Sequence, residues 1–239
     1  MRVVLVVVSL LLVAGCVASA EPGEPAYGVD AGEIEDRLRE VARLRSEVDA
    51  EVEASLAVMG EVGGVLTTVR SPSRAPSGFA AVGQIRDDLD DLDPDGLRED
   101  LRELAAAVDD ARADLTLVAE GSDGWEEEYL GAQDRVLVAV REHAAAVDAL
   151  VQLIDRHRTT YATVLEKLAE VEDDPGEDPE GDRDLAEEAE EALSGRLEPV
   201  SLAQEELTTY AERREATAGA VNEATADAAM VFDRRPDGT

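Results

Sequence analysis

The chain has 239 residues, of which 56 are acidic and 22 are basic, giving a formal charge of −34. Binding to nucleic acid requires clustered Lys and Arg to contact phosphates, so we expect no nucleic-acid partner. The length suffices for one or two domains with a hydrophobic core. A single cysteine excludes an intramolecular disulfide.

Residues 1–15 have the pattern of a signal peptide. A lone basic residue precedes the apolar run Val3–Leu12, and the small residues Ala14 and Gly15 stand directly before Cys16. The run is too short to cross a bilayer, which takes about 20 apolar residues, and it has the length of a signal-peptide core. These residues resemble the signal peptide and lipobox of prokaryotic lipoproteins. The alternatives are an ordinary cleaved signal peptide and a retained membrane helix.

The lipoprotein resemblance implies cleavage before Cys16 and attachment of lipid to its sulfur. It places the protein outside the cytoplasm, anchored to the outer face of the cytoplasmic membrane. One lipid chain gives only marginal anchoring, and an acidic body is repelled by anionic head groups, so we expect a doubly lipidated cysteine. Residues 16–32 are rich in Pro, Gly and acidic residues and predict a flexible tether. At its end, Asp30 and Glu33 fit a helix capping box.

The composition also resembles that of proteins from organisms living near salt saturation. Lysine occurs only at Lys167, and aromatic residues make up 3% of the chain. At molar salt the Debye length falls to about 3 Å, which screens self-repulsion in such a chain. An acidic protein from a mesophile with a GC-rich genome is the alternative.

The stretch 33–232 predicts an all-α domain. Its apolar residues step by four and three, the spacing of a coiled coil or a long bundle helix, and no alternating strand pattern occurs. A first helix is expected over about 31–69, with Arg45 and Ser55 filling two positions of its apolar seam. Gly60, Gly63 and Gly64 predict a close helix approach or a local bend. The apolar seam positions are Ile34, Leu38, Val41, Val48, Val52, Met59, Val62, Leu66 and Val69.

A second helical stretch is expected from about Phe79 to Val118, between loops at 71–78 and 120–124. Pro94 interrupts it and predicts a kink or short break, with Asp93 as the helix cap. Its seam comprises Val82, Ile85, Leu89, Leu92, Leu97, Leu101, Leu104, Val108, Ala111, Leu115 and Val118.

The third helix, 125–172, has the most regular pattern, and an acidic linker at 173–182 follows it. Its seam comprises Val136, Val140, His143, Val147, Leu150, Ile154, His157, Tyr161, Val164, Leu168 and Val171. The last helical stretch runs over 183–232 with an interruption at Pro199, and 233–239 is expected to be a disordered tail. Its seam comprises Val200, Ala203, Leu207, Tyr210, Arg214, Thr217, Val221, Ala224, Ala228 and Val231.

Four long helical stretches with short polar connections predict an antiparallel four-helix bundle with kinks near Pro94 and Pro199. Two successive helical hairpins that pair with another protomer are the alternative. Trp125, Tyr129, Tyr161 and Tyr210 fall at seam-compatible positions and are expected in the core.

Two histidines are candidates for a site. His143 and His157 lie fourteen residues apart, about 21 Å along a helix, so within one chain they cannot share a metal ion. We expect seam histidines bonded to polar groups on neighbouring helices; a ligand or a pH-sensing role is the alternative.

Asp91, Asp93, Asp95 and Gly96 resemble the first half of an EF-hand calcium loop. The resemblance fails at Arg102, where a bidentate Glu belongs, and helix capping explains the same residues. Calcium is therefore an alternative, and no cofactor besides the covalent lipid is expected.

We find no nucleophile motif and no phosphate-binding glycine loop in the sequence, and we expect no enzyme. The predicted function is that of an envelope scaffold, spacer or interaction module that contacts another envelope protein or itself. The alternative is a ligand- or metal-binding sensor that signals to a membrane partner.

Overall fold

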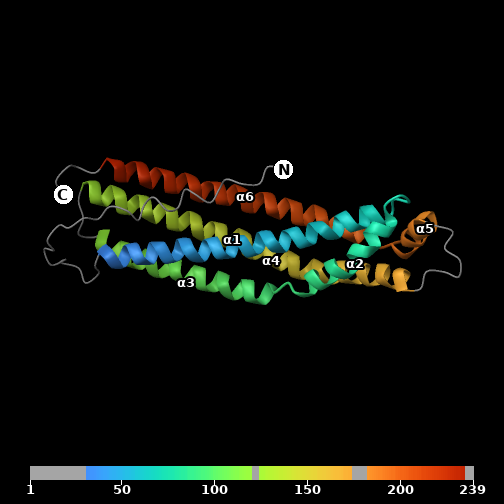
Figure 1. Cartoon of the computed structure of the whole chain (residues 1–239). Helices are drawn as coiled ribbons and strands as arrows, with labels where there is room; N and C mark the ends of the chain where they lie inside the picture. Colours follow the sequence, from blue (N-terminus) through green and yellow to red (C-terminus); the bar gives the residue numbers. More distant parts are fainter. Residues whose placement is uncertain (1–30, 120–123, 174–181, 235–239) are drawn as a thin grey trace. The chain divides into compact units, whose positions relative to one another are not determined.

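The chain is all-α. The computed structural model describes residues 31–119, 124–173 and 182–234, and within these ranges it has six helices and no strand (Figure 1). The signal peptide, Cys16, Asp30 and most of the tether lie outside the described residues, as do 120–123, 174–181 and 235–239. The helices are α1 (Ala31–Val69), α2 (Ala75–Asp90), α3 (Pro94–Ala119), α4 (Trp125–Asp173), α5 (Asp182–Ala192) and α6 (Leu197–Asp233).

The helices build two compact units. Among the described residues, unit 1 comprises 31–48, 100–119, 124–145 and 215–234, and unit 2 comprises 49–99, 146–173 and 182–214. The helices α1, α4 and α6 contribute a segment to each unit. In unit 1, α1 and α4 run in one direction while α3 and α6 run in the other (Figure 1), an antiparallel four-helix arrangement.

The core of both units is built from the predicted seams. Helix α1 has the predicted bounds, and α4 ends one residue beyond them. Most of the seam residues are buried, because a 3.5-residue period keeps them on one face of the helix, where they pack against the other helices. Leu38, Leu92, Val136 and Tyr210 are among the seam residues that are only half-buried. The fully covered side chains include Val52, Val62, Val69, Val82, Leu89, Leu104, Val108, Val147, Leu150, Ile154, Tyr161 and Leu168.

The two polar seam residues of α1 are buried as well, with Arg45 8% exposed and Ser55 5% exposed. The Ser55 hydroxyl donates a 3.0 Å hydrogen bond to the Glu51 carbonyl one turn earlier, which satisfies it within its own helix. A Cβ at Gly63 would lie 2.1 Å from Nε2 of Gln204 on α6, so the amide end of this α6 side chain packs against the glycine. Gly60 and Gly64 face open space.

The loop predicted over 71–78 is shorter than expected. Helix α2 begins at Ala75 with a proline in its first turn, where the missing N–H is not needed. Gly78 is therefore a buried helix residue, and a Cβ there would lie 2.9 Å from the backbone nitrogen of Val69. Helix α2 thus packs closely on the end of α1, and it also packs against α5.

The two predicted breaks are present, and one of them is displaced. Residues 91–93 separate α2 from α3, which begins at Pro94 as expected. The later break falls at residues 193–196 instead of at Pro199, with Gly195 in the left-handed region at φ +71°. Pro199 lies in the first turn of α6, where proline is well tolerated.

Of the described residues, only the helical stretch Glu33–Val69 is long and apolar enough to cross a membrane by length and composition. Its most apolar window has a mean hydropathy of 1.3, and 39% of that window is buried. Core helices of soluble proteins pass the same test, so length and composition alone do not make α1 a membrane span.

Candidate functional site

His143 lies in the core of unit 1. Its side chain is 1% exposed, and Nδ1 lies 2.9 Å from the Thr217 hydroxyl of α6. Both residues occupy seam positions, so the polar pair replaces an apolar contact between α4 and α6. The predicted bond from a seam histidine to a neighbouring helix is confirmed here.

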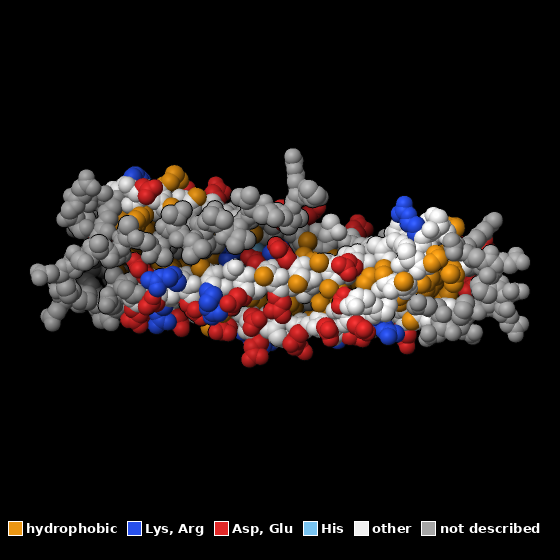
Figure 2. All heavy atoms as spheres, viewed as in Figure 1, with side chains coloured by type: hydrophobic (Ala, Val, Ile, Leu, Met, Phe, Trp, Pro, Cys, Tyr) orange, Lys and Arg blue, Asp and Glu red, His pale blue; other side chains and the backbone are white. Residues whose placement is uncertain are grey.

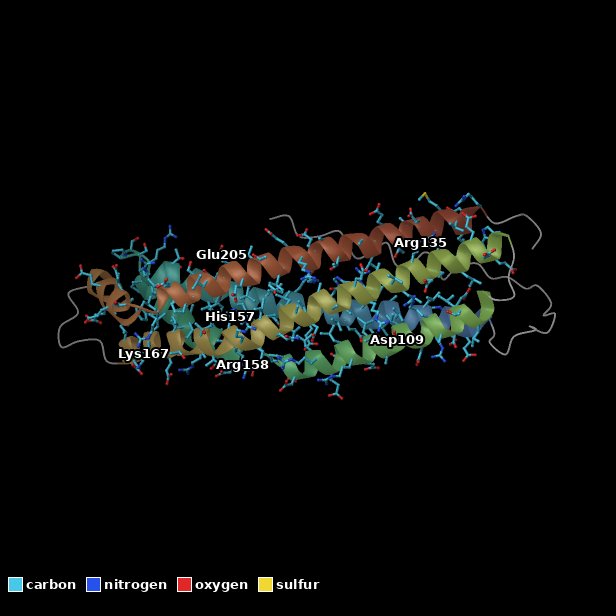
Figure 3. All side chains as sticks on the ribbon, turned by 180° about the vertical axis from the view of Figure 1, so that it is seen from behind. Asp109, Arg135, His157, Arg158, Lys167 and Glu205 are labelled. Atoms are coloured by element: carbon cyan, nitrogen blue, oxygen red, sulfur yellow. The ribbon has the colours of Figure 1, made fainter. Side chains whose placement is uncertain are left out.

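His157 lies on α4 in unit 2 (Figure 3), and its Nε2 lies 2.8 Å from a carboxylate oxygen of Glu206 on α6. The imidazole is largely covered, while the carboxylate is half-exposed. This histidine also has the predicted contact with a polar group on a neighbouring helix.

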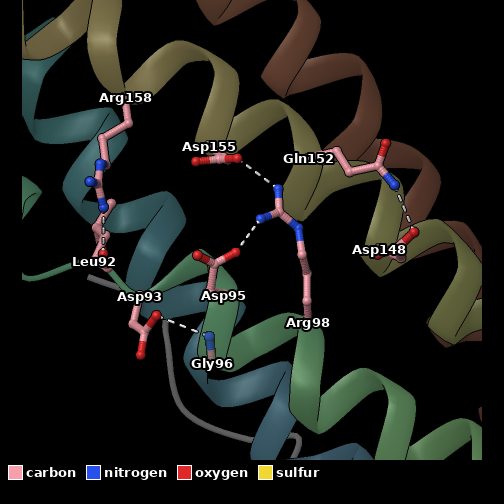
Figure 4. A network of polar contacts seen from close by, with 9 residues as sticks. All are labelled: Leu92, Asp93, Asp95, Gly96, Arg98, Asp148, Gln152, Asp155 and Arg158. Carbon is pink, nitrogen blue, oxygen red and sulfur yellow. Dashed lines mark hydrogen bonds and ion pairs between the residues drawn. The ribbon is translucent and has the colours of Figure 1, made fainter.

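The three aspartates of the EF-hand-like motif have separate structural roles. Asp93 caps α3, because its Oδ1 accepts a 2.9 Å hydrogen bond from the Gly96 N–H (Figure 4). Asp95 bonds to Arg98 at 2.7 Å, and Asp91 is the C-cap residue of α2. The capping interpretation of Asp93 is confirmed. Within the described ranges, no three His, Cys, Asp or Glu side chains are placed to hold a metal ion.

Arginine ties the break between α2 and α3 to α4 (Figure 4). Arg98 donates from its second terminal nitrogen to Asp155 at 2.7 Å, and Arg158 donates to the Leu92 carbonyl at 2.7 Å. The hydrogen bonds to Asp155 and Asp95 raise the pKa of Arg98 above its ordinary value. These two hydrogen bonds therefore fix the break between α2 and α3 against α4.

Other arginines join helices within each unit. In unit 2, Arg214 of α6 bonds to Asp49 at 2.9 Å and to Glu53 at 3.1 Å, both on α1. In unit 1, Arg141 of α4 pairs with Asp109 of α3 at 2.9 Å. An arginine fork matches a carboxylate well, which gives the few cations of this acidic chain a role between helices.

On the face seen in Figure 2, the described residues show more acidic than basic side chains. The large apolar side chains most exposed among the described residues are Leu117, Leu202 and Met230. They lie at separate positions on α3 and α6, and single exposed apolar residues are ordinary on a soluble protein.

A hollow in unit 1 lies between α1, α4 and α6 and has a volume of about 140 Å³. Eleven of its sixteen lining residues have apolar or aromatic side chains. Its lining runs from Glu35, Tyr129 and Phe232 at one end to Arg45 and Val140 at the other, following the directions of α1 and α4. An apolar hollow bounded by three helices is a common form of small-molecule site in a bundle.

The polar wall of this cavity contains two buried side chains, Arg45 and Gln133, each 8% exposed. At the end of the cavity away from Arg45, Glu35 accepts a 3.2 Å hydrogen bond from Arg39, which also pairs with Asp36. Arg39 is therefore compensated on its own helix.

An aromatic cluster lies at the Glu35 end of the cavity, where Tyr129 and Phe232 are part of the lining. Trp125 stacks on Tyr129 with ring centroids 5.3 Å apart, and Phe232 contacts both rings. Trp125 Nε1 donates a 2.8 Å hydrogen bond to the Val231 carbonyl. Burial raises the pKa of Tyr129. We expected Trp125, Tyr129 and Tyr161 in the core. Trp125 and Tyr129 are partly buried and pack against the edge of the unit 1 core, whereas Tyr161 is fully buried in unit 2.

Sequence reasoning did not find this cavity. The available signal was Arg45, a cation in an apolar seam, together with the small residues Ala228 and Ala229 on α6. Neither histidine lines the cavity, which reaches Val140, one turn before His143.

Comparisons with protein-family models, curated proteins and solved structures found no match to this chain.

Proposed function

We propose that this chain is a lipid-anchored protein of the outer face of the cytoplasmic membrane, whose helical body is a non-enzymatic interaction module of the envelope. It acts as a scaffold or spacer and contacts another envelope protein or a second copy of itself. The observation that carries the proposal is the sequence Ala14, Gly15, Cys16 after an apolar run, with the only cysteine of the chain at the lipidation position.

The use of polar side chains in the body supports a structural role. Buried and half-buried polar groups join helices: His143 with Thr217, His157 with Glu206, and Arg214 with Asp49. Side chains engaged in this way position helices and stabilise a unique packing, as polar residues in bundle seams do.

The experiment follows interactions of the full chain in living cells. A photo-crosslinking residue is placed at Leu117, Leu202 or Met230, the most exposed large apolar positions among the described residues. An interaction module is expected to give a discrete adduct from at least one of these positions, and Cys16→Ser is expected to remove it. Absence of discrete adducts from all three positions contradicts the proposal.

A second candidate function is ligand binding, with the body acting as a sensor that signals to a membrane partner. The observation that favours it is the cavity between α1, α4 and α6 in unit 1, with Arg45 and Gln133 in its wall. Saturable binding of a small molecule to the full chain tests this candidate directly.

A further inference from the structure

We propose that the exposed face of α2 in unit 2 pairs with the same face of a second copy of this chain, with the two helices antiparallel. The inference deepens the proposed interaction module, on which it rests, by naming its partner and its surface.

The part of the chain around α2 lacks acidic residues. Residues 62–86 form a run of 25 residues without Asp or Glu that contains three arginines, whereas the other acid-free runs within the described ranges have ten residues or fewer. Two bodies that each have a formal charge of −34 repel each other. This repulsion is weakest where acidic side chains are missing, so the charge distribution favours self-association through the end of α1 and the first part of α2.

Helix α2 has one exposed face and one buried face. Ser77, Ala80, Gln84 and Asp87 are exposed and step by three, four and three, the spacing of neighbours on one side of a helix. We call these four residues the α2 face. The other side packs into unit 2 through Ala75, Gly78, Phe79, Val82, Ile85 and Leu89. The side chains at Ser77 and Ala80 are short, which permits another helix to approach α2 closely.

The two ends of α2 carry charges that the helix itself disfavours. Arg74 is the N-cap residue and makes no side-chain cap, and Asp87 lies in the last turn. A helix favours negative charge at its N-terminus and positive charge at its C-terminus. Both side chains are exposed, and neither forms an ion pair among the described residues. Charges placed against the helix dipole without a partner in the same chain indicate a contact outside it.

Antiparallel pairing of two α2 helices brings these charges together. With the two-fold axis midway between residues 80 and 81, Arg74 of one copy lies level with Asp87 of the other, and Ser77 lies level with Gln84. An arginine and a carboxylate form a strong charge-assisted hydrogen bond. Arg74 and Asp87 of one chain are thirteen residues apart, about 20 Å along the helix, so this pair forms only between two copies. The same surface serves both copies, as in other two-fold interfaces.

The length of α2 sets the strength of the pair. The helix has 16 residues and is about 24 Å long. One face of such a helix offers less area than the roughly 800 Å² per partner of a standard stable interface, so we expect a weak dimer in solution. Lipid anchors that hold both copies on one membrane raise their effective concentration. A weak pair therefore suits an anchored interaction module.

The test crosslinks the full chain in membranes of a bacterial host. Ala80→Cys places a thiol in the middle of the α2 face, and a short bismaleimide joins two such thiols. We expect a crosslinked product that mass spectrometry identifies as two copies of this chain. Wild type, whose only cysteine is Cys16, is the blank. Ala226→Cys makes the same change at an exposed position of α6 in unit 1 and is the matched control.

The proposal predicts a higher yield of dimer from Ala80→Cys than from Ala226→Cys. Equal yields from the two variants, no dimer, or a product that contains a different protein overturns it.

Charge reversal tests which residues meet. Arg74→Asp and Asp87→Arg, each added to Ala80→Cys, are expected to lower the yield of dimer by about fivefold or more, because like charges then lie opposite each other. Both reversals combined in one chain are expected to restore it. Each reversal agrees with the helix dipole, and Asp is a favoured N-cap residue, so neither is expected to unfold α2. Arg86→Asp makes the same charge change two residues from Gln84, on a different side of α2, and is expected to leave the yield unchanged.

Circular dichroism of each purified variant confirms that it is folded. Single reversals that leave the yield unchanged, or a combined variant that does not restore it, overturn the pairing of Arg74 with Asp87. Lipid on Cys16 is measured by mass spectrometry on the same membranes. A lipidated chain without crosslinked dimer overturns the α2 pairing and leaves the anchored interaction module standing, whereas a dimer without lipid supports the pairing and contradicts the anchor. Absence of both contradicts both.

Discussion

Replacing Tyr161 with phenylalanine is expected to stabilise the protein. Tyr161 is 0% exposed, and its hydroxyl has no hydrogen-bond partner among the described residues. A buried polar group without a partner costs about 1–3 kcal/mol. The variant keeps the ring and removes only the hydroxyl, so the free energy of unfolding is expected to rise by about 1 kcal/mol at neutral pH.

The same residue predicts a dependence on alkaline pH. Burial raises the pKa of Tyr161 to about 12, against about 10 in the unfolded chain. Below pH 10 the phenol is neutral in both states, and its ionisation does not affect the free energy of unfolding. As the pH rises from 10 to 12, the unfolded chain ionises first, so the free energy of unfolding of the wild type falls. A difference of about two units corresponds to about 2.7 kcal/mol. The advantage of Tyr161→Phe over wild type is therefore expected to grow between pH 10 and 12.

Urea unfolding followed by circular dichroism at pH 7, 10 and 11 measures both effects. Tyr210→Phe, which changes a partly exposed tyrosine of α6, is the matched control and is expected to leave the free energy of unfolding nearly unchanged. A loss of 1 kcal/mol or more in Tyr161→Phe at pH 7 refutes the reasoning, since it means that the hydroxyl makes a stabilising bond.

The remaining predictions concern the cap of α3, two glycines and salt. Asp93→Ala is expected to lower the free energy of unfolding by about 1 kcal/mol in urea titrations, whereas Asp93→Asn keeps a capping oxygen and most of the stability. If millimolar CaCl2 stabilises the wild type and Asp93→Ala abolishes this effect, capping is not the only role of Asp93. Gly78→Ala is expected to lower the free energy of unfolding, because its Cβ would meet the Val69 backbone at 2.9 Å. Gly64→Ala has open space around it and is expected to raise the free energy of unfolding by about 0.5–1 kcal/mol. If Gly78→Ala is the more stable of the two variants, α2 does not pack on α1 as described. With a formal charge of −34, the melting temperature is expected to rise between 0.1 and 2 M NaCl through screening, and an unchanged value contradicts the importance of self-repulsion.

Most of the helices could be predicted because their apolar residues repeat with a regular period. The bounds of α1 and α4, and the burial of residues such as Val52 and Ile154, follow directly from the four-three spacing. The same register placed His143 between helices, and the structure pairs it with Thr217.

The positions of helix starts were harder to predict. Proline both ends a helix and fits the first turn of the next one, so the prolines before Gly78 and at Pro199 did not distinguish loop from helix start. In both places the proline lies in the first turn of the new helix: α2 begins at Ala75 and α6 begins at Leu197. The local residues allowed either outcome, and packing of α2 on Val69 favours the helical one.

The cavity could not be predicted because it depends on the relative placement of three helices. Each lining segment has an ordinary pattern by itself, and the hollow arises where Ala228 and Ala229 of α6 face larger residues of α1 and α4. The sequence identified Arg45 as a polar exception in its seam, but it did not show which residues of α4 and α6 lie opposite it.

The most direct test of the central proposal is a mass spectrum of the N-terminal peptide of the protein isolated from membranes of a bacterial host fed with an alkyne-tagged fatty acid. The proposal predicts a peptide that begins at Cys16 and carries two or more acyl chains, and it predicts that Cys16→Ser loses the tag. An unmodified Cys16 in the wild-type protein, or a tag that persists in the variant, would contradict it.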